Sequence, residues 1–154
     1  KRLNISRNEA SEIINQYKSS YPDVQNYLMS TIKFAEKNEY VETITGRRRY
    51  IRDINSNNKM IKAGAERNAI NAPIQGTAAD MIKIAMINIE SLLQKERVKT
   101  KMLLQVHDEL VFDLWPEEKE YLLPKIEKLM KSAIPMKIPI VIQSGIGRNW
   151  LEAH

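Results

Sequence analysis

Residues 65–93 read AERNAINAPIQGTAADMIKIAMINIESLL, and this stretch decides which fold the chain can adopt. Its second half repeats apolar side chains every three or four residues, which is the spacing of a core-facing stripe on an α-helix. The members of this stripe are Ala78, Met81, Ala85, Ile89 and Leu92. Pro73 has no N–H and its ring clashes with the preceding turn. We therefore expect a long helix after the polar loop at 53–60, either kinked near Pro73 or divided into two helices near residues 70–73.

The residues before this stretch predict two helices and a hairpin. Ser6 and Glu9 have the spacing of a capping box, so a helix should begin near residue 7. Pro22 suits a first helical turn, and the apolar spacing carries a second helix to about residue 38. Residues 40–51, YVETITGRRRYI, alternate and contain β-branched side chains, which predicts a hairpin that turns at Thr45-Gly46.

The residues after it predict a second hairpin, LLQVHDELVFDL at 103–114, in which two apolar runs meet at His-Asp. A tight turn is served better by Asn-Gly or Asp-Gly, because glycine adopts positive φ most easily. A helix at 117–132 follows Pro116, and Pro139 marks 138–147 as an edge strand or a strand start. This order of elements predicts an α+β fold with an antiparallel sheet and packed helices.

Composition limits the classes of function. The 154 residues fit one domain or a piece of one, and 24 Lys and Arg against 19 Asp and Glu give a net charge of +5, which favours a polyanionic partner. The absence of Cys excludes disulfides and thiolate metal sites, so any metal should be bound by oxygen, as Mg²⁺ is. No run approaches the ~18 apolar residues of a membrane span.

The tip of the second hairpin is the first candidate site. If the strands are 102–106 and 109–114, Asp108 stands at the apex beside His107 and Glu109. A Mg²⁺ ion that also holds a substrate phosphate takes one or two protein carboxylates and needs them on a rigid support. The alternative is that His107 and Asp108 are turn residues with a purely structural role.

A polar line on the long helix is the second candidate. Arg67, Asn71 and Gln75 fall at i, i+4 and i+8 among mostly small neighbours. These residue types hydrogen-bond base edges and sugars, and the minor groove offers acceptors to them. The alternative is a solvated polar face, and Pro73 could rotate Gln75 off the line. The arginines at 47–49 suit phosphate contact, or a strand edge kept basic to prevent aggregation.

Four motifs together resemble the family A DNA polymerases, of the bacterial polymerase I type. They are GRRRYIRDI at 46–54, ERNAINAPIQGTAADMIK at 66–83, VHDEL at 106–110 and GIGRNWLEAH at 145–154. The resemblance covers the whole chain. It implies that residues 1–154 are the C-terminal part of a polymerase domain, with 1–40 from the fingers side and 41–154 in the palm, in a cytoplasmic, nucleoid-associated bacterial enzyme of DNA replication and repair.

The resemblance also assigns roles to residues. It implies that Asp108 is one of two aspartates that hold a pair of Mg²⁺ ions, which Mn²⁺ can replace, and that Glu109 is a secondary acidic residue beside them. His107 would lie near the primer 3′ end. The polar helix line would touch the primer-template from its minor-groove side. For the arginines the resemblance gives no role, and from their charge we expect Arg47 and Arg48 to contact the DNA backbone.

The chain departs from the family pattern in what it lacks. The second metal-binding aspartate and the nucleotide-gripping residues of the fingers helix do not occur between Lys1 and His154, and Asp53, Asp80 and Asp113 do not stand in a matching context. We therefore expect the isolated chain to be inactive. Its partners would be primer-template DNA, deoxynucleoside triphosphates and the remainder of the polymerase chain, and uncovered apolar surface could make it self-associate.

Two rival functions remain from the residues alone. A non-enzymatic nucleic-acid-binding module would explain the basic charge but gives Asp108 and Glu109 no task, because carboxylates repel phosphate unless a cation stands between them. A Mg²⁺-dependent nuclease would use the same metals, and it would degrade DNA without added nucleotides.

Overall fold

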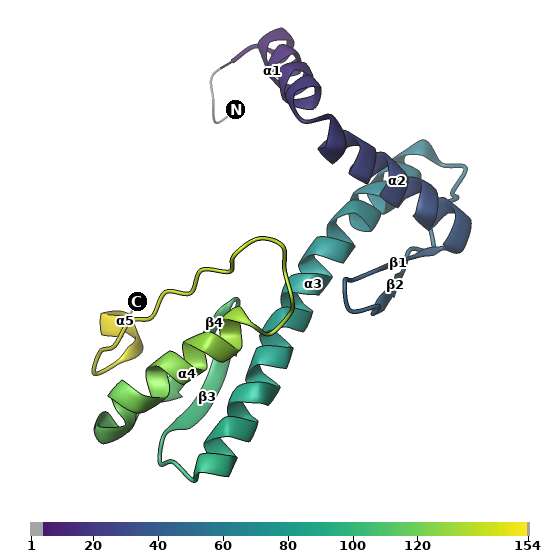
Figure 1. Cartoon of the computed structure of the whole chain (residues 1–154). Helices are drawn as coiled ribbons and strands as arrows, with labels where there is room; N and C mark the ends of the chain where they lie inside the picture. Colours follow the sequence, from purple (N-terminus) through teal and green to yellow (C-terminus); the bar gives the residue numbers. More distant parts are fainter. Residues whose placement is uncertain (1–4, 154) are drawn as a thin grey trace. The chain divides into compact units, whose positions relative to one another are not determined.

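The computed structural model describes residues 5–153 and confirms an α+β fold (Figure 1). Its elements are α1 (Arg7–Ser20), α2 (Pro22–Asn38), β1 (Tyr40–Glu42), β2 (Arg48–Tyr50), α3 (Lys59–Glu96), β3 (Lys101–Val106), β4 (Glu109–Asp113), the 3₁₀ turn η1 (Pro116–Glu118), α4 (Lys119–Lys131) and α5 (Trp150–Ala153). The strands form two separate antiparallel pairs, β1–β2 and β3–β4. The chain divides into two compact units, residues 1–76 and 77–154, and α3 contributes to both.

The first helix begins where the sequence predicts. The Ser6 hydroxyl accepts a hydrogen bond from the Glu9 N–H at 3.2 Å, and the Glu9 carboxylate accepts one from the Ser6 N–H at 2.7 Å. Both halves of the capping box are therefore present, and two otherwise unpaired backbone donors are satisfied. Pro22 opens α2 at its first position, as expected from its fixed φ.

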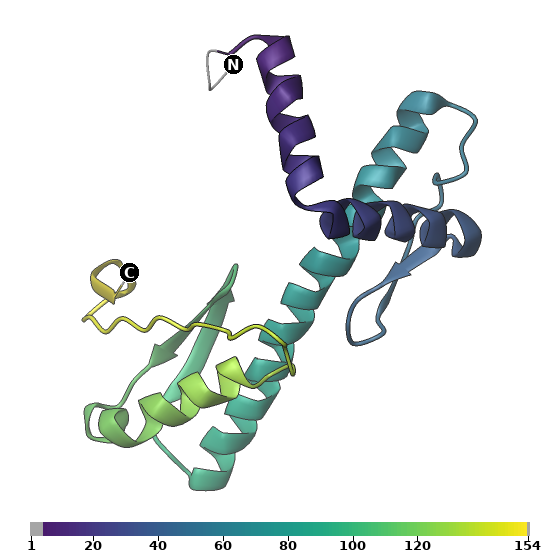
Figure 2. The ribbon, with the colours of Figure 1, turned by 45° about the horizontal axis from the view of Figure 1, so that its top comes forward.

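The core of the first unit lies between α2, the β1–β2 hairpin and the first half of α3 (Figure 2). Its buried residues are Ala35, Val41, Ile51, Ile54, Ala65, Ala69 and Ala72. The contribution of α3 to this core is alanine only, which lets the backbones of neighbouring elements approach closely. The small residues that the sequence places around the polar line thus face the protein core.

The β1–β2 hairpin turns through residues 43–46, where the Gly46 N–H donates to the Thr43 carbonyl at 2.9 Å. Gly46 has φ +83°, a left-handed conformation that glycine adopts without a Cβ penalty. Beyond the turn, the Arg47 guanidinium donates to the Gly76 carbonyl on α3 at 3.0 Å. A Cβ at Gly76 would lie 2.6 Å from the Thr43 Cγ2. The hairpin therefore packs on α3 at a point where only glycine fits.

The core of the second unit combines the second half of α3 with the β3–β4 hairpin and α4, which Figure 2 shows beside it. Ala85, Ile89 and Leu93 on α3 and Leu122 and Ile126 on α4 are its buried members. Ala85 and Ile89 confirm the expected stripe, and Met81 and Leu92 are half-buried. Ala78 is exposed, so its assignment to the stripe was wrong. The buried neighbour at that level of the helix is Asp80.

Pro73 lies inside one continuous helix, so the alternative of two helices joined near residues 70–73 is wrong. Proline removes the single hydrogen bond that its own N–H would donate to the carbonyl four residues earlier. The turn before Pro73 remains packed, since Ala69 and Ala72 are buried, and in the turn after it the Gly76 carbonyl accepts a hydrogen bond from Arg47. Tertiary packing therefore holds the helix together across a residue that disfavours it.

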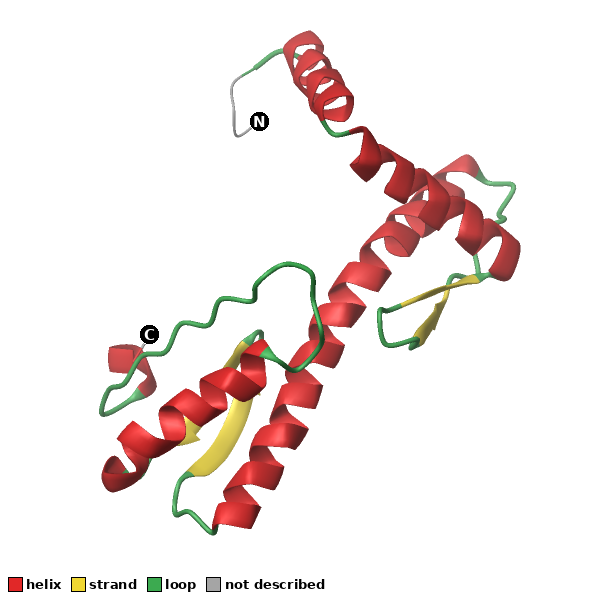
Figure 3. Cartoon of the chain, in the orientation of Figure 1, coloured by secondary structure: helices red, strands yellow, loops and turns green. Residues whose placement is uncertain are grey.

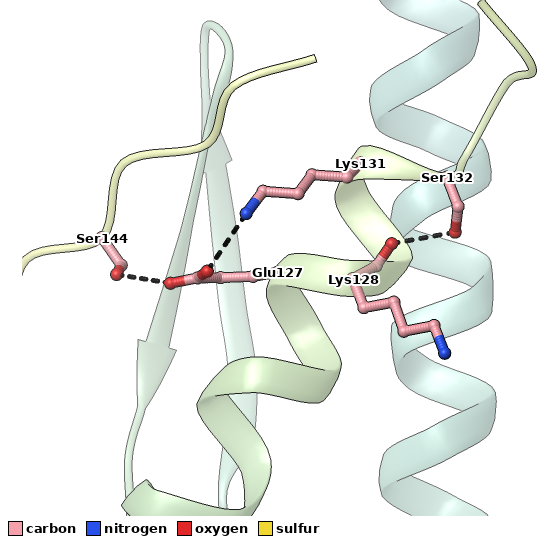
Figure 4. A network of polar contacts seen from close by, with 5 residues as sticks. All are labelled: Glu127, Lys128, Lys131, Ser132 and Ser144. Carbon is pink, nitrogen blue, oxygen red and sulfur yellow. Dashed lines mark hydrogen bonds and ion pairs between the residues drawn. The ribbon is translucent and has the colours of Figure 1, made fainter. Parts of the chain in front are cut away.

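Residues 138–147, expected to form a strand, have no strand assignment in the described chain, which corrects the prediction (Figure 3). A strand must pair with the edge of a sheet. Within residues 5–153 each of the two sheets has only two strands, and residues 138–147 join neither of them. Pro139 also removes one ladder donor. The segment is tied to α4 instead, because the Ser144 hydroxyl donates to the Glu127 carboxylate at 2.8 Å and Lys131 pairs with that carboxylate at 3.4 Å (Figure 4).

The close approach at Gly76 predicts opposite effects of alanine at two glycines of the same helix. At Gly64 a Cβ meets nothing nearer than the Arg67 guanidinium at 3.8 Å. Gly64→Ala should therefore raise the free energy of unfolding by about 0.5–1 kcal/mol, because alanine has the higher helix propensity. At Gly76 the new methyl group would overlap the side chain of Thr43, a buried residue that is only 8% exposed. Gly76→Ala should therefore lower the free energy of unfolding by about 1–3 kcal/mol. Urea unfolding followed by circular dichroism measures both, and equal stabilisation would contradict the packing described.

Candidate nucleic-acid interface and catalytic carboxylate

The β3–β4 hairpin ends in a two-residue turn. Val106 pairs with Glu109, so His107 and Asp108 alone form the loop. His107 has φ +53°, which lies in the left-handed region. Glycine is the residue usually found at the first loop position of such a turn when φ is positive. The Gln105 amide donates to the His107 carbonyl at 2.8 Å and fixes the turn from the strand below it. Both loop side chains are exposed, and Glu109 is half-buried. The tip thus presents the imidazole and the Asp108 carboxylate to solvent from a short, hydrogen-bonded support.

The base of the same hairpin is fixed by the Glu118 carboxylate of η1. This group accepts hydrogen bonds from the Lys99 N–H at 2.7 Å, the Thr100 N–H at 2.9 Å and the Thr100 hydroxyl at 2.7 Å. The buried Thr100 hydroxyl in turn accepts from the Trp115 N–H at 3.0 Å. The Glu118 carboxylate therefore links the residues that precede β3 to the η1 turn that follows β4.

These contacts also change the acidity of Glu118. Partial desolvation raises the pKa of its carboxyl, but the hydrogen bonds from Lys99 and Thr100 together outweigh desolvation, and the pKa lies below its ordinary value. The ionised form is the one that the fold stabilises.

The carboxylates at the tip fit part of a Mg²⁺ site. Asp108 and Glu109 are adjacent, and no group of three or more His, Asp or Glu that could hold a metal occurs among residues 5–153. Mg²⁺ bound with a substrate phosphate takes one or two carboxylates and completes its octahedron with phosphate oxygens and water. The residues at the tip therefore fit a minor share of such a coordination shell, and the described residues do not complete it.

The polar line lies on the first unit, and the hairpin tip lies on the second. Arg67, Asn71 and Gln75 are all exposed. The alanine face of α3 is buried on the other side of the helix, so Pro73 does not rotate Gln75 into the core. Three donors of the types that read acceptors in a minor groove thus share one solvent-facing side of the helix.

The three consecutive arginines have different partners. Arg47 donates to the Gly76 carbonyl, and Arg48 donates to the Glu42 carboxylate at 2.8 Å while its guanidinium lies 4.5 Å from the centre of the Tyr40 ring. Arg49 is exposed, and within residues 5–153 its side chain has no hydrogen bond or ion pair in the structure. Sequence reasoning could not distinguish the three, because alternation along a strand does not reveal which carbonyl or carboxylate lies opposite.

The net positive charge of the chain belongs to the first unit. Residues 1–76 contain 13 Lys and Arg against 8 Asp and Glu, whereas residues 77–154 contain 11 of each. The unit that carries the polar line and the arginines is thus basic, and the unit that carries the exposed carboxylate is neutral. This division suits a phosphate-contacting part and a metal-binding part. No helix within the described residues is long and apolar enough to cross a membrane.

Comparison with known proteins identifies the family. The family model described as "DNA polymerase family A" matches residues 1–152. The chain is 45% identical over 150 residues to DNA polymerase I of Caldicellulosiruptor bescii, covering 97% of this chain and 18% of the relative. It is 42% identical over 151 residues to DNA polymerase I of Bacillus caldotenax, covering 98% of this chain and 17% of the relative.

A solved structure agrees with the sequence comparisons. The Pol1 polymerase domain from M. smegmatis, in complex with DNA primer-template and dNTP, superposes with a TM-score of 0.94 at 39% identity, covering 99% of this chain and 27% of that one. The chain belongs to DNA polymerase family A. It spans less than a fifth of the length of the curated relatives named here.

The Glu118 contacts predict a pH-dependent contribution to stability. Because the folded state lowers the pKa of Glu118, its stabilisation is complete above the ordinary glutamate pKa and is lost as the pH falls through the lowered value. Glu118→Gln should lower the thermal midpoint at neutral pH and reduce the loss of stability on acidification. The exposed neighbour Glu117 gives a charge-matched control, Glu117→Gln, which should follow the wild type. Parallel pH profiles for all three proteins would contradict this assignment.

Proposed function

We propose that residues 1–154 are the primer-holding and partly catalytic portion of a DNA-directed DNA polymerase that uses two-metal-ion nucleotidyl transfer. The observation that carries the proposal is the exposed Asp108 carboxylate on a two-residue hairpin tip, in a chain that matches the family A model over residues 1–152. A binding module would place no bare carboxylate beside a phosphate backbone.

In this mechanism Asp108 would hold a metal ion, Glu109 would add a second carboxylate beside it, and His107 would contact the primer terminus. When bound, Mg²⁺ supplies Lewis acidity at the primer 3′-hydroxyl and charge neutralisation at the triphosphate, and Mn²⁺ can take its place. The chain contributes position: the turn at His107 and the Gln105 hydrogen bond keep the carboxylate in place while DNA binds. Rigid support of this kind is what a metal-binding carboxylate requires.

The polar helix line holds the primer-template by its minor groove. Arg67, Asn71 and Gln75 can donate to acceptors that every base pair presents there, so binding is insensitive to sequence. Arg47 and Arg48 are fixed by their contacts with Gly76 and Glu42, which orients their remaining N–H groups for the DNA backbone. The basic first unit supplies the long-range attraction.

The isolated chain is inactive in this proposal, because it has one metal-binding aspartate and no nucleotide-gripping helix. Deoxynucleoside triphosphates and the remainder of a polymerase chain complete the site. An open apolar groove of about 280 Å³ between α1 and α2, lined by residues such as Ile13, Tyr17 and Val24, is surface that the remainder would cover or that self-association would bury.

A graft tests the catalytic role. Residues 1–154 replace the corresponding segment of the Caldicellulosiruptor bescii enzyme, and primer extension is measured with Mg²⁺ and dNTPs. The graft should extend primers, and Asp108→Asn should reduce extension by at least about a hundredfold, since outer-shell changes alone cost 10–100-fold at metal sites. Asp113→Asn makes the same charge change at an exposed position of β4 and should retain activity.

The other outcomes separate the rival functions. Extension by the Asp108→Asn graft at the level of the Asp113→Asn graft would remove Asp108 from catalysis. DNA degradation without nucleotides, lost in Asp108→Asn, would indicate a nuclease. Mg²⁺-dependent extension by the isolated 154 residues would contradict the proposed inactivity of the chain alone.

Fluorescence anisotropy with the 154-residue chain tests the polar line. Combining Arg67→Ala, Asn71→Ala and Gln75→Ala should weaken binding to a primer-template and to blunt duplex by about ten- to a thousandfold, as three lost hydrogen bonds of ~0.5–1.5 kcal/mol each imply. The control replaces one cation and two amides in the second half of the same helix, by Asn88→Ala, Gln94→Ala and Lys95→Ala. It should bind like the wild type. Equal affinities for the two triple variants would contradict the assignment.

A further inference from the structure

A cavity of about 440 Å³ lies where α3 ends and β3 begins. Its lining includes Gln94, Arg97, Thr100 and Lys101, and we call it the basic cavity. All of the lining residues belong to the second unit. The cavity is at the base of the β3–β4 hairpin, and the length of β3 places Lys101 roughly 20 Å from the tip. None of the candidate site residues named above lines this cavity.

The helix that borders the cavity ends in a Schellman motif. The Val98 N–H donates to the Leu93 carbonyl at 3.4 Å, and the Arg97 N–H donates to the Gln94 carbonyl at 3.3 Å. Such a motif needs one residue in the left-handed conformation, and glycine is the usual choice. Here that residue is Arg97, with φ +52°. Because glycine would adopt this conformation at lower free energy, the turn itself does not explain an arginine at this position.

The charges around Arg97 are mostly positive. Residues 95–101 contain four exposed cations, Lys95, Arg97, Lys99 and Lys101. Within residues 5–153 none of the four has an ion pair. The one acidic residue of this segment, Glu96, is already paired with Lys125 at 2.7 Å. An anion among these cations would therefore reduce a repulsion that the described chain leaves uncompensated.

Two carboxylates lie near the cations without cancelling them. Glu90 lines the cavity, and its carboxylate accepts a hydrogen bond from the Gln94 amide at 2.9 Å. Asp113 is the cross-strand partner of Lys101, but the two side chains form no ion pair in the described part of the chain. The cavity thus has two cations, Arg97 and Lys101, against one carboxylate in its lining.

The dipole of α3 explains only part of this charge pattern. The C-terminal end of a helix carries a partial negative charge, which favours cations in the last turn. Lys95 stands in that turn. Lys99 and Lys101 lie beyond it, and the dipole does not require an arginine where glycine relieves the backbone.

We propose that the basic cavity binds a free oligophosphate of the pyrophosphate class. The inference rests on the proposed function, because transfer of a nucleotide from a triphosphate releases pyrophosphate. The planar guanidinium of Arg97 presents paired N–H donors that match two phosphate oxygens, and Lys101 adds a second cation. A concave site of this volume suits a compact ligand, whereas a DNA duplex presents a long row of phosphates.

Isothermal titration calorimetry of the 154-residue chain with sodium pyrophosphate tests the proposal. The buffer contains no divalent cation, so the Asp108 carboxylate repels the anion instead of binding it through a metal. One pyrophosphate should bind per wild-type chain. Arg97→Gly should lower the affinity by at least about tenfold, as expected for a lost hydrogen bond to a charged group. Arg97→Lys keeps the charge and should bind more tightly than Arg97→Gly.

A matched control removes a cation elsewhere on the same helix. Lys83 is exposed on α3 and does not line the cavity, so Lys83→Gln should bind pyrophosphate like the wild type. Equal weakening by Lys83→Gln and Arg97→Gly would reduce the effect to general attraction by charge and overturn the inference. Absence of pyrophosphate binding by the wild-type chain also overturns it.

Thermal unfolding of the same variants distinguishes a binding role from a structural one. Glycine relieves the left-handed conformation at position 97, so Arg97→Gly should raise the thermal midpoint by about 1–4 °C while it weakens binding. A midpoint that falls together with the affinity would make Arg97 a structural cap and overturn the inference. Unchanged pyrophosphate affinity of Arg97→Gly has the same meaning.

Two further titrations separate this inference from the proposed function. The polar-line triple variant should bind pyrophosphate like the wild type, and Arg97→Gly should bind blunt duplex DNA like the wild type in the anisotropy assay. Weaker duplex binding by Arg97→Gly would assign the cations to the DNA backbone and overturn the inference, while the polar line would stand. Failure of the graft to extend primers would contradict the proposed function, and the calorimetry would still show whether the cavity binds pyrophosphate.

Discussion

Burial of the alanine face of α3 is the constraint on which the candidate DNA-contact surface depends. Ala65, Ala69 and Ala72 pack against α2 and the first hairpin, and helical geometry then places Arg67 and Asn71 on the opposite side and Gln75 on an exposed flank. Alanine also sets how near the hairpin can come, and Gly76 extends the same close approach by one turn. The polar line and the arginines are therefore held in place by contacts to which α3 contributes only small side chains.

The two candidate sites rest on different kinds of support. The polar line uses the side of a helix, where spacing alone aligns donors over two turns. The carboxylate uses a hairpin tip that is fixed at both ends, by Gln105 at the turn and by Glu118 at the base. A minor groove tolerates small shifts of a donor, whereas metal coordination does not, and the more constrained support carries the group with the stricter geometric requirement.

Local patterns were sufficient to predict much of the fold. The capping box, Pro22 and the two hairpins act through neighbouring residues, and each is present where the sequence indicates. Errors arose where distant partners decide. Residues 138–147 join neither sheet of the described chain, and Pro73 stays within α3, where the turn before it is packed in the core. The partners of Arg47 and Arg48 lie 29 and 6 residues away, beyond the reach of strand periodicity. The proposed catalytic and DNA-binding roles came from the motifs together, and the structure shows only that the residues concerned are exposed or half-buried and how their backbone is held.

The left-handed backbone at His107 has a consequence for how this sequence can change over time. A histidine there is held in a conformation that glycine would adopt at lower free energy, so the position lies away from its stability optimum. Screening for heat resistance alone would favour glycine at this turn, and the imidazole would disappear without any loss of folded protein. If His107 has its proposed role, thermostabilised descendants obtained in that way would be well-folded proteins with an impaired site, and position 107 should be held constant in any such library.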